Sequence, residues 1–171
     1  MSKKFITFIT LLWTTALHAN SSPLGIELNK ATLEDVKKSY RILNSVPNSM
    51  KGYYTHFLDI QNIQMDTLSE VLVISNDNKI IEGVMLMLDK NKFDEFNKVL
   101  SDKYKVLSSN IPFVGDKNVR LQDGDCYILL DAPHMSFTMD MIYATKHLIS
   151  IAGNRTDKER QEKKEKIKEM L

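Results

Sequence analysis

Apolar positions recur at helical spacing in two segments of the chain. The first predicted helix begins at Thr32, where the sequence Thr-Leu-Glu-Asp forms a capping box, and its apolar face continues through Tyr40 to Leu43. The second extends over residues 91–104 with the same spacing. Its apolar positions are Phe93, Phe96, Leu100 and Tyr104, with Val99 beside them. Both segments therefore predict amphipathic helices.

The segments that follow these helices contain the β-branched and aromatic runs typical of strands. The predicted strands cover residues 53–60, 71–74, 80–88, 119–121, 126–130 and 136–143. The sequence Asn76-Asp77-Asn78 predicts a hairpin turn, and Gly83 predicts a bulge in the strand after it. Residues 147–152 fit either a helix or a strand. This order predicts an α+β domain of antiparallel β-meanders with the helices packed on one side.

The two predicted helices begin sixty residues apart, and their residues agree in type at that offset, as Leu33 and Phe93 illustrate. Each helix is followed by about three predicted strands. This regularity predicts two related helix-plus-meander halves, residues 26–89 and 90–152, within one domain over residues 20–154. Chance agreement between two amphipathic helices is the alternative.

The two ends of the chain differ in composition from the segments between them. Residues 1–19 contain a lysine-led start, an apolar run of thirteen residues and a small residue, Ala19, which is the order of a secretory signal peptide. A membrane-spanning helix needs about 20 residues, so we expect cleavage near Ala19 and a periplasmic or secreted protein. Residues 155–171 are mostly charged, with both signs, and predict a solvent-exposed C-terminal helix.

Charge and cysteine content argue against some classes of protein. The 171-residue chain has a formal net charge of +1, whereas nucleic-acid binding requires a basic surface. Cys126 is the single cysteine, so no internal disulfide forms and no cysteine follows the apolar run to carry a lipid anchor. Its apolar neighbours predict a buried side chain; a reactive thiol and an intermolecular disulfide are the alternatives. We expect no nucleic-acid partner and no integral membrane anchor.

The sequence contains no motif for catalysis, metal binding or cofactor binding. The histidines after the predicted signal peptide are His56, His134 and His147, and their spacing matches no zinc-binding pattern. The glycines form no phosphate-binding loop, and no Gly-x-Ser-x-Gly sequence provides a serine nucleophile. The sequence alone does not decide whether two acidic residues form a catalytic pair for sugar hydrolysis, because the distance between them depends on the fold. We therefore predict no catalytic residue, no metal site and no cofactor.

Methionines alternate with other residues in two of the predicted strands. Met85 and Met87 lie on one face of their strand, and Met139 and Met141 repeat the pattern close to Phe137. Methionine fills gaps in cores and also forms adaptable binding surfaces. Two interpretations follow: packing in the core, or a partner-binding face made of these five residues.

An apolar lead segment, Ile26-Glu27-Leu28, precedes the capped helix that opens at residues 31–36, and strands between residues 53 and 88 follow. In this order the chain resembles the β-lactamase-inhibitor-protein-like fold and the small outer-membrane-assembly lipoproteins. It lacks the anchoring cysteine of those lipoproteins and the disulfides of the inhibitor halves. The resemblance implies binding rather than catalysis.

Three functions are open from the sequence. The first is a non-enzymatic periplasmic binding protein that recognises another envelope or secreted protein through a sheet face, as an inhibitor or an immunity protein does. The second is a structural or assembly factor of the cell envelope that uses the charged tail as a tether. The third is a hydrolase of envelope material, for which a cleft with convergent acidic groups is expected.

Overall fold

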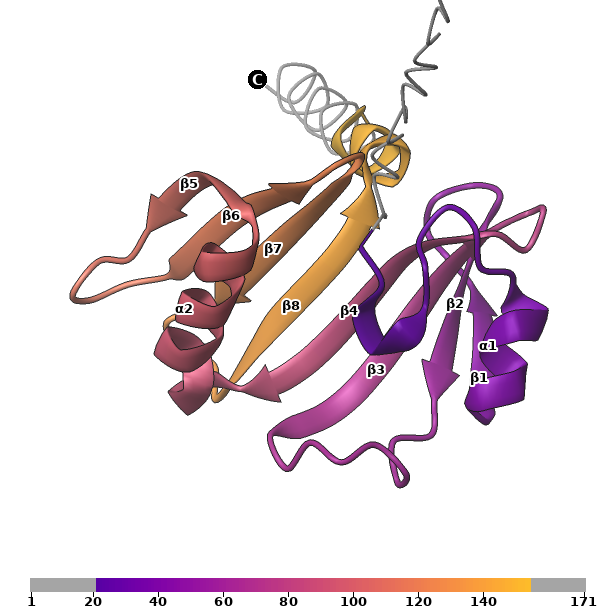
Figure 1. The fold of residues 1–171 in the computed structure, drawn as a ribbon, viewed down its shortest axis with the longest axis horizontal. Coiled ribbons are helices and arrows are strands. Elements are labelled where there is room, and N and C mark those ends of the chain that lie inside the picture. The colour runs from indigo at the N-terminus through magenta and orange to yellow at the C-terminus, as the bar shows by residue number, and fades with distance from the viewer. Residues whose placement is uncertain (1–20, 155–171) are drawn as a thin grey trace, which may run out of the picture.

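The computed structural model describes residues 21–154, which fold into an eight-stranded antiparallel sheet and its helices (Figure 1). The helices are η1 (Pro23–Gly25), α1 (Leu33–Ser39), η2 (Lys90–Lys92) and α2 (Phe93–Lys103), and a helix that we call the third helix covers residues 146–154. The strands are β1 (Ile42–Pro47), β2 (Tyr53–Leu58), β3 (Leu68–Asn76), β4 (Ile81–Asp89), β5 (Lys105–Asn110), β6 (Lys117–Asp123), β7 (Cys126–Ala132) and β8 (Thr138–Thr145). The predicted α+β class is confirmed.

The strand order places β4 and β8 at the centre of the sheet. The order is β1-β2-β3-β4-β8-β7-β6-β5, and every neighbouring pair is antiparallel. α1 precedes the four strands on one side of this centre, and α2 precedes the four on the other (Figure 1). Consecutive strands within each group are neighbours, so only the β4–β8 pairing joins strands that are distant in the sequence.

The capping box predicted at Thr32 is present in the structure. The Thr32 hydroxyl accepts a hydrogen bond from the Asp35 N–H at 3.2 Å, and the Asp35 carboxylate accepts one from the Thr32 N–H at 3.1 Å. The helix ends at Ser39, because the backbone of Tyr40 is extended. The prediction that the helical face continues to Leu43 is therefore wrong, and Leu43 lies in β1 with an exposed side chain.

The two edge strands, β1 and β5, have no counterpart among the predicted strands. Every residue of β5 is exposed, and in β1 only Ile42 and Val46 are partly buried. Neither strand buries a continuous face, so neither has the alternation of apolar and polar residues that predicts a strand. The six strands between them coincide with the six predicted strands, with shifted bounds.

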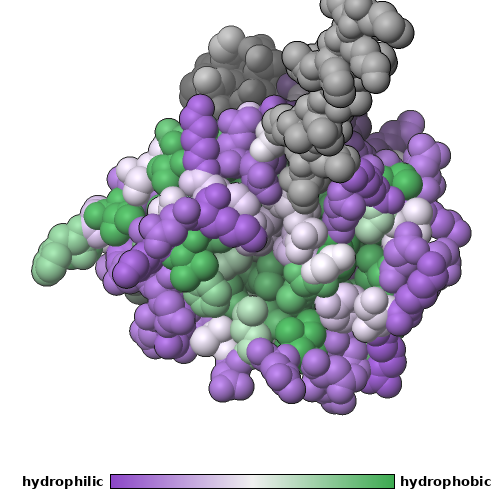
Figure 2. Space-filling model, in the orientation of Figure 1, coloured by the Kyte–Doolittle hydropathy of each residue, from purple (hydrophilic) through white to green (hydrophobic). Residues whose placement is uncertain are grey.

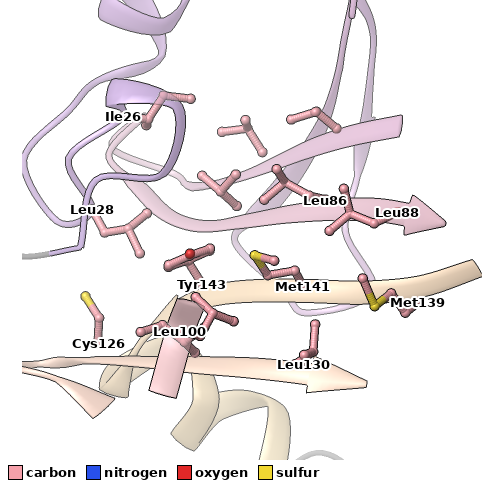
Figure 3. Packing of buried hydrophobic residues seen from close by; sticks show 14 of the residues in the cluster. Ile26, Leu28, Leu86, Leu88, Leu100, Cys126, Leu130, Met139, Met141 and Tyr143 are labelled. Atoms are coloured by element: carbon pink, nitrogen blue, oxygen red, sulfur yellow. The ribbon is translucent and has the colours of Figure 1, made fainter. Parts of the chain in front are cut away.

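One face of the sheet packs against α1 and α2 and forms the main core; we call it the helix face. Along the central strands every second side chain points into this core, which α1, α2 and the segment before α1 complete (Figure 3). Its central members on β4 and β8 are Val84, Leu86, Leu88, Met139, Met141 and Tyr143. Figure 2 shows this side of the molecule, where apolar residues gather between the two helices. Cys126 is buried in the same core, and burial raises the pKa of its thiol.

The third helix packs on the opposite face of the sheet. Its Leu148 belongs to a second apolar cluster that includes Tyr53 and Ala144. Gly83 of β4 permits this close approach, because a Cβ atom at Gly83 would lie 2.7 Å from Leu148 Cδ2. The prediction that the helices pack on one side is correct for α1 and α2 and wrong for the third helix.

The predicted signal peptide (residues 1–19) and the predicted charged helix (residues 155–171) lie outside the described residues. Within residues 21–154, no helix combines the length and the apolar composition needed to cross a membrane.

Candidate functional site

In the part of the chain that the structure describes, the sheet face opposite α1 and α2 is covered only at one end, by the third helix; we call the remainder the open face. Directly paired residues of antiparallel strands place their side chains on the same face, so the strand register defines rows of side chains across it. One row, which we call the middle row, crosses all eight strands. It consists of Asn44, Phe57, Leu72, Met85, Ile142, Leu129, Arg120 and Ser108.

The centre of the middle row is apolar and only half-buried. Leu72, Met85, Ile142 and Leu129 are each of intermediate exposure, whereas Leu86, the neighbour of Met85 on the helix face, is buried. Ile142 also packs against the apolar cluster around Leu148, and Ile149 of the third helix lines a hollow together with Leu129. Leu72 and Met85 belong to neither apolar cluster of the described residues. A contiguous apolar surface of this kind on a folded domain is typical of an interaction site.

A second row, which we call the lower row, runs beside the middle row and is acidic. It consists of Glu70, Met87, Asp140, Asp131, Asn118 and Asn110. Asp131 and Asp140 are direct cross-strand partners. Burial raises the pKa of Asp140, and the charges of Asp131 and Glu70 raise it further. Within the described residues, none of these three carboxylates takes part in an ion pair.

Two hollows flank the middle row on the side of β5 to β8. The first has a volume of about 390 Å³ and lies between Leu107 at the edge of the sheet and Ile149 of the third helix. The second has a volume of about 250 Å³ and reaches Asp131. Arg120 and Leu129 line both hollows. The open face is therefore indented where its apolar and acidic rows meet, which allows side chains of a partner to enter.

A β-bulge in β4 distinguishes the covered end of this face. Ile74 pairs with Gly83 and Ser75 pairs with Ile81, which leaves Glu82 as the extra residue. The predicted bulge is thus present, one residue before Gly83. Glu82 is only 3% exposed, so its carboxylate needs hydrogen-bond partners inside the protein.

Four side chains from four elements satisfy the Glu82 carboxylate. Its Oε2 atom accepts from His147 Nδ1 at 2.9 Å, Thr145 Oγ1 at 3.2 Å and Tyr53 Oη at 3.3 Å, and Oε1 accepts from Asn76 Nδ2 at 2.8 Å. Burial raises the pKa of Glu82, but these donors outweigh it and hold the pKa below its usual value. Burial and the nearby carboxylate raise the pKa of Tyr53 to about 12. The network joins the third helix to the sheet, so we assign it a structural role.

His56 is buried between β1 and β3, with a serine on each side. Ser45 Oγ lies 2.8 Å from Nδ1, and Ser75 Oγ lies 2.9 Å from Nε2. Burial lowers the pKa of His56, and Lys37 lowers it further. A neutral imidazole has one donor and one acceptor nitrogen, which two hydroxyl groups satisfy. The arrangement accounts for the burial of His56 and leaves no free ring nitrogen for catalysis or metal binding.

The other histidines also lie apart from any metal-binding arrangement in the described chain. His134 lies on the loop before β8, where its backbone N–H donates to Asp116 Oδ1 at 2.7 Å. His147 belongs to the network around Glu82. Among residues 21–154, no three His, Cys, Asp or Glu side chains are grouped so that they could hold a metal ion.

The structure separates the five residues predicted to form a partner-binding face. Met85 and Met87 lie on the open face, in the middle and lower rows. Met139 and Met141 lie on the helix face and are buried in the core (Figure 3). Phe137 lies on the loop before β8 and is almost fully exposed. The five side chains therefore do not form a single surface.

The register between β4 and β8 explains this separation. Met85 pairs with Ile142, so Ile142 lies on the open face and its neighbour Met141 points the other way. The sequence prediction correctly placed each methionine pair on one face of its strand, but the two pairs lie on opposite faces of the sheet. The sequence prediction did not include Leu72 and Leu129 in the binding face. In the sequence, each of these residues is marked only by the apolar run in which it lies.

Two adjacent loops at the lower-row end of the sheet also expose apolar side chains. Phe113 of the β5–β6 loop, and Met135 and Phe137 of the β7–β8 loop, are almost fully exposed. The loops are joined by the hydrogen bond from the His134 N–H to Asp116. They add exposed apolar side chains at this end of the sheet.

No family model, curated protein or solved structure matches this chain. The resemblance to β-lactamase-inhibitor-like proteins therefore stays a prediction from the sequence.

Proposed function

We propose that this protein is a non-enzymatic binding protein that recognises another protein through its open face. The observation that carries the proposal is the half-buried apolar row of Leu72, Met85, Ile142 and Leu129, which the third helix reaches only beside Ile142 and Leu129. Burial of apolar surface drives most protein association, and rigid strands hold this surface in place before a partner arrives. The exposed loop residues Met135 and Phe137 would add to the contact area.

The arrangement favours binding over hydrolysis of envelope material. One candidate hydrolase pair is Asp131 and Asp140, which lie directly opposite each other on the sheet face. The hollow that reaches Asp131 is not lined by Asp140, so this hollow does not enclose both carboxylates. A glycosidase pair instead flanks an enclosed scissile bond at a separation of roughly 5–10 Å.

The proposal includes export and an internal repeat. Residues 1–19 would direct the chain to the periplasm and be removed near Ala19, where the protein would act as an inhibitor or immunity protein of an envelope or secreted partner. Residues 26–89 and 90–152 would be related halves, since α1 and α2 each precede a four-stranded meander and the strand order mirrors about β4 and β8. The alternative of an envelope assembly factor would place the protein in the membrane fraction.

Site-specific photocrosslinking tests the proposed function. A photoreactive amino acid replaces Met85 or Leu129 on the open face in separate variants, and Val99, an exposed residue of α2, in the control. In cells that produce the protein, we expect the two open-face positions to crosslink one partner with near-stoichiometric yield and the Val99 position to crosslink none. Equal yields at all three positions, or no crosslink from the open face, would contradict the proposal.

A further inference from the structure

We propose that the partner segment bound by the open face is cationic, with Lys or Arg side chains that lie over the lower row and apolar side chains that lie over the middle row. This inference rests on the proposed function and specifies the chemistry of the partner. It does not follow from the apolar row alone, which would accept a neutral or an acidic apolar segment equally well.

The charges of the two rows carry the inference. The middle and lower rows contain three carboxylates, Glu70, Asp140 and Asp131, and a single cation, Arg120. No side chain within residues 21–154 forms an ion pair with any of these three carboxylates. Other acidic residues, such as Glu34 and Asp35 of α1, do have a lysine partner. The lower row is therefore an acidic strip whose three carboxylates have no ion pair within the described residues.

The position of the strip beside apolar residues determines what can cover it. Met87 lies between Glu70 and Asp140 in the lower row, and Met85 and Ile142 lie in the row above. A partner that buries these apolar side chains removes water from the carboxylates at the same time, and an unpaired buried charge is strongly unfavourable. A partner with acidic or neutral groups at this position leaves the carboxylates unpaired, so the strip discriminates against it.

The geometry also favours a charged group on a long aliphatic stem. The side chains of directly paired antiparallel residues lie close together, with Cβ atoms about 4.5–5.5 Å apart, so Asp131 and Asp140 leave the sheet side by side on one face. The guanidinium group of Arg can bridge two such carboxylates. The aliphatic stems of Arg and Lys can at the same time lie along the apolar middle row.

A pair of defined peptides tests the inference on the purified protein. Both are synthetic amphipathic helices with the same leucines, and the remaining positions are all Lys in one and all Glu in the other. Calorimetric titration at low and at high salt gives the two affinities. We expect the Lys peptide to bind at least about tenfold more tightly than the Glu peptide, with an affinity that falls as salt rises.

Substitutions in the lower row locate the effect. The double variant with Asp131→Asn and Asp140→Asn should weaken binding of the Lys peptide by about tenfold or more, since two charged contacts are lost. Asp102→Asn makes the same kind of change at an exposed residue of α2 and should leave the affinity unchanged. Equal affinities for the two peptides, or equal effects of the lower-row and Asp102 variants, would overturn the inference.

A neutral substitution in the middle row separates failure of this inference from failure of the proposed function. Met85→Gln removes apolar surface without a change of charge, and Val99→Gln is its control on α2. If Met85→Gln weakens binding and the double Asn variant does not, the open face binds but the charge inference is wrong. If neither has an effect, the peptide binds elsewhere, and both the inference and the proposed function lose support.

Discussion

Asp131 of β7 and Asp140 of β8 face each other directly across two paired strands, on the side of the sheet away from the main core. Like charges in this position destabilise an antiparallel pair. Nothing else in the described residues forms an ion pair with either carboxylate. The folded protein therefore carries an electrostatic cost at the surface that we propose as its binding site.

Asp140→Asn should stabilise the free protein against urea. Burial, with Asp131 and Glu70, raises the pKa of Asp140 above its usual 3.8. The native state is thus favoured while this group is protonated, and that contribution is lost as the pH rises through the raised pKa. We expect the free energy of unfolding of the variant to exceed that of the original protein by roughly 0.2–1 kcal/mol at about pH 7. This difference should shrink toward about pH 4. Asp66→Asn, on an exposed loop, should show no such pH-dependent gain.

Glu82→Gln should destabilise the protein and loosen the third helix. The amide of Gln brings an NH₂ group into a site where all four neighbours donate to the carboxylate, so at least one buried group loses its partner. Such a loss costs about 1–3 kcal/mol. Thermal melts and hydrogen exchange over residues 146–154 measure the two effects, and Glu34→Gln on α1 is the exposed control.

The same variant should change the response to acid. The hydrogen-bond donors hold the pKa of Glu82 below its usual 4.5 in spite of burial, so its ionised form stabilises the native state above that pH. This contribution is lost as the pH falls through the lowered pKa. The difference in stability between the original protein and Glu82→Gln should therefore narrow in acid. A difference that is independent of pH would show that the carboxylate is not ionised in the folded protein.

Gly83→Val should displace the third helix. A Cβ atom at this position would lie 2.7 Å from Leu148 Cδ2, which is closer than packed atoms allow, and 3.4 Å from Ile74 Cβ, which is a tight contact. Overpacking of this kind costs about 1–3 kcal/mol. Leu148→Ala removes the clashing methyl group, so the double variant should be more stable than the sum of the two single effects predicts. If the changes in the free energy of urea unfolding of the two single variants add up to that of the double variant, the two residues are not in contact.

Val36→Asp should unfold the domain, whereas Val99→Asp should leave it folded. Val36 of α1 is buried in the main core at 2% exposure, and Val99 of α2 is 59% exposed. An unpaired buried carboxylate costs several kcal/mol out of the roughly 5–15 kcal/mol that stabilise a domain. Circular dichroism and thermal melts distinguish the two variants, and similar melting temperatures would contradict the assignment of the core.

Features that depend on neighbouring residues were predictable from the sequence. The capping box at Thr32 and Asp35 needs only four consecutive residues, and the long apolar runs of β4 and β7 are visible as strands. The edge strands β1 and β5 were missed because their residues are mostly exposed. A strand held chiefly by backbone pairing to one neighbour leaves little trace in the pattern of side chains.

The candidate site was only half predictable, because it depends on pairing between distant strands. Alternation places Met139 and Met141 on one face of β8, but only the register with β4 determines that this face is the core. A shift of one residue would exchange the two faces. The partners of Glu82 likewise come from four elements, and no spacing in the sequence brings Tyr53 and His147 together.

Methyl NMR spectroscopy of the methionines tests the central claim most directly. Met85 and Met87 lie on the open face, while Met139 and Met141 are buried on the other side of the same sheet and serve as internal controls. The protein is labelled at its methionine methyl groups and titrated with the partner captured by crosslinking. We predict that the signals of Met85 and Met87 shift or broaden while those of Met139 and Met141 stay in place. Binding of the partner with no change at Met85 and Met87 would contradict the assignment of the open face as the binding surface.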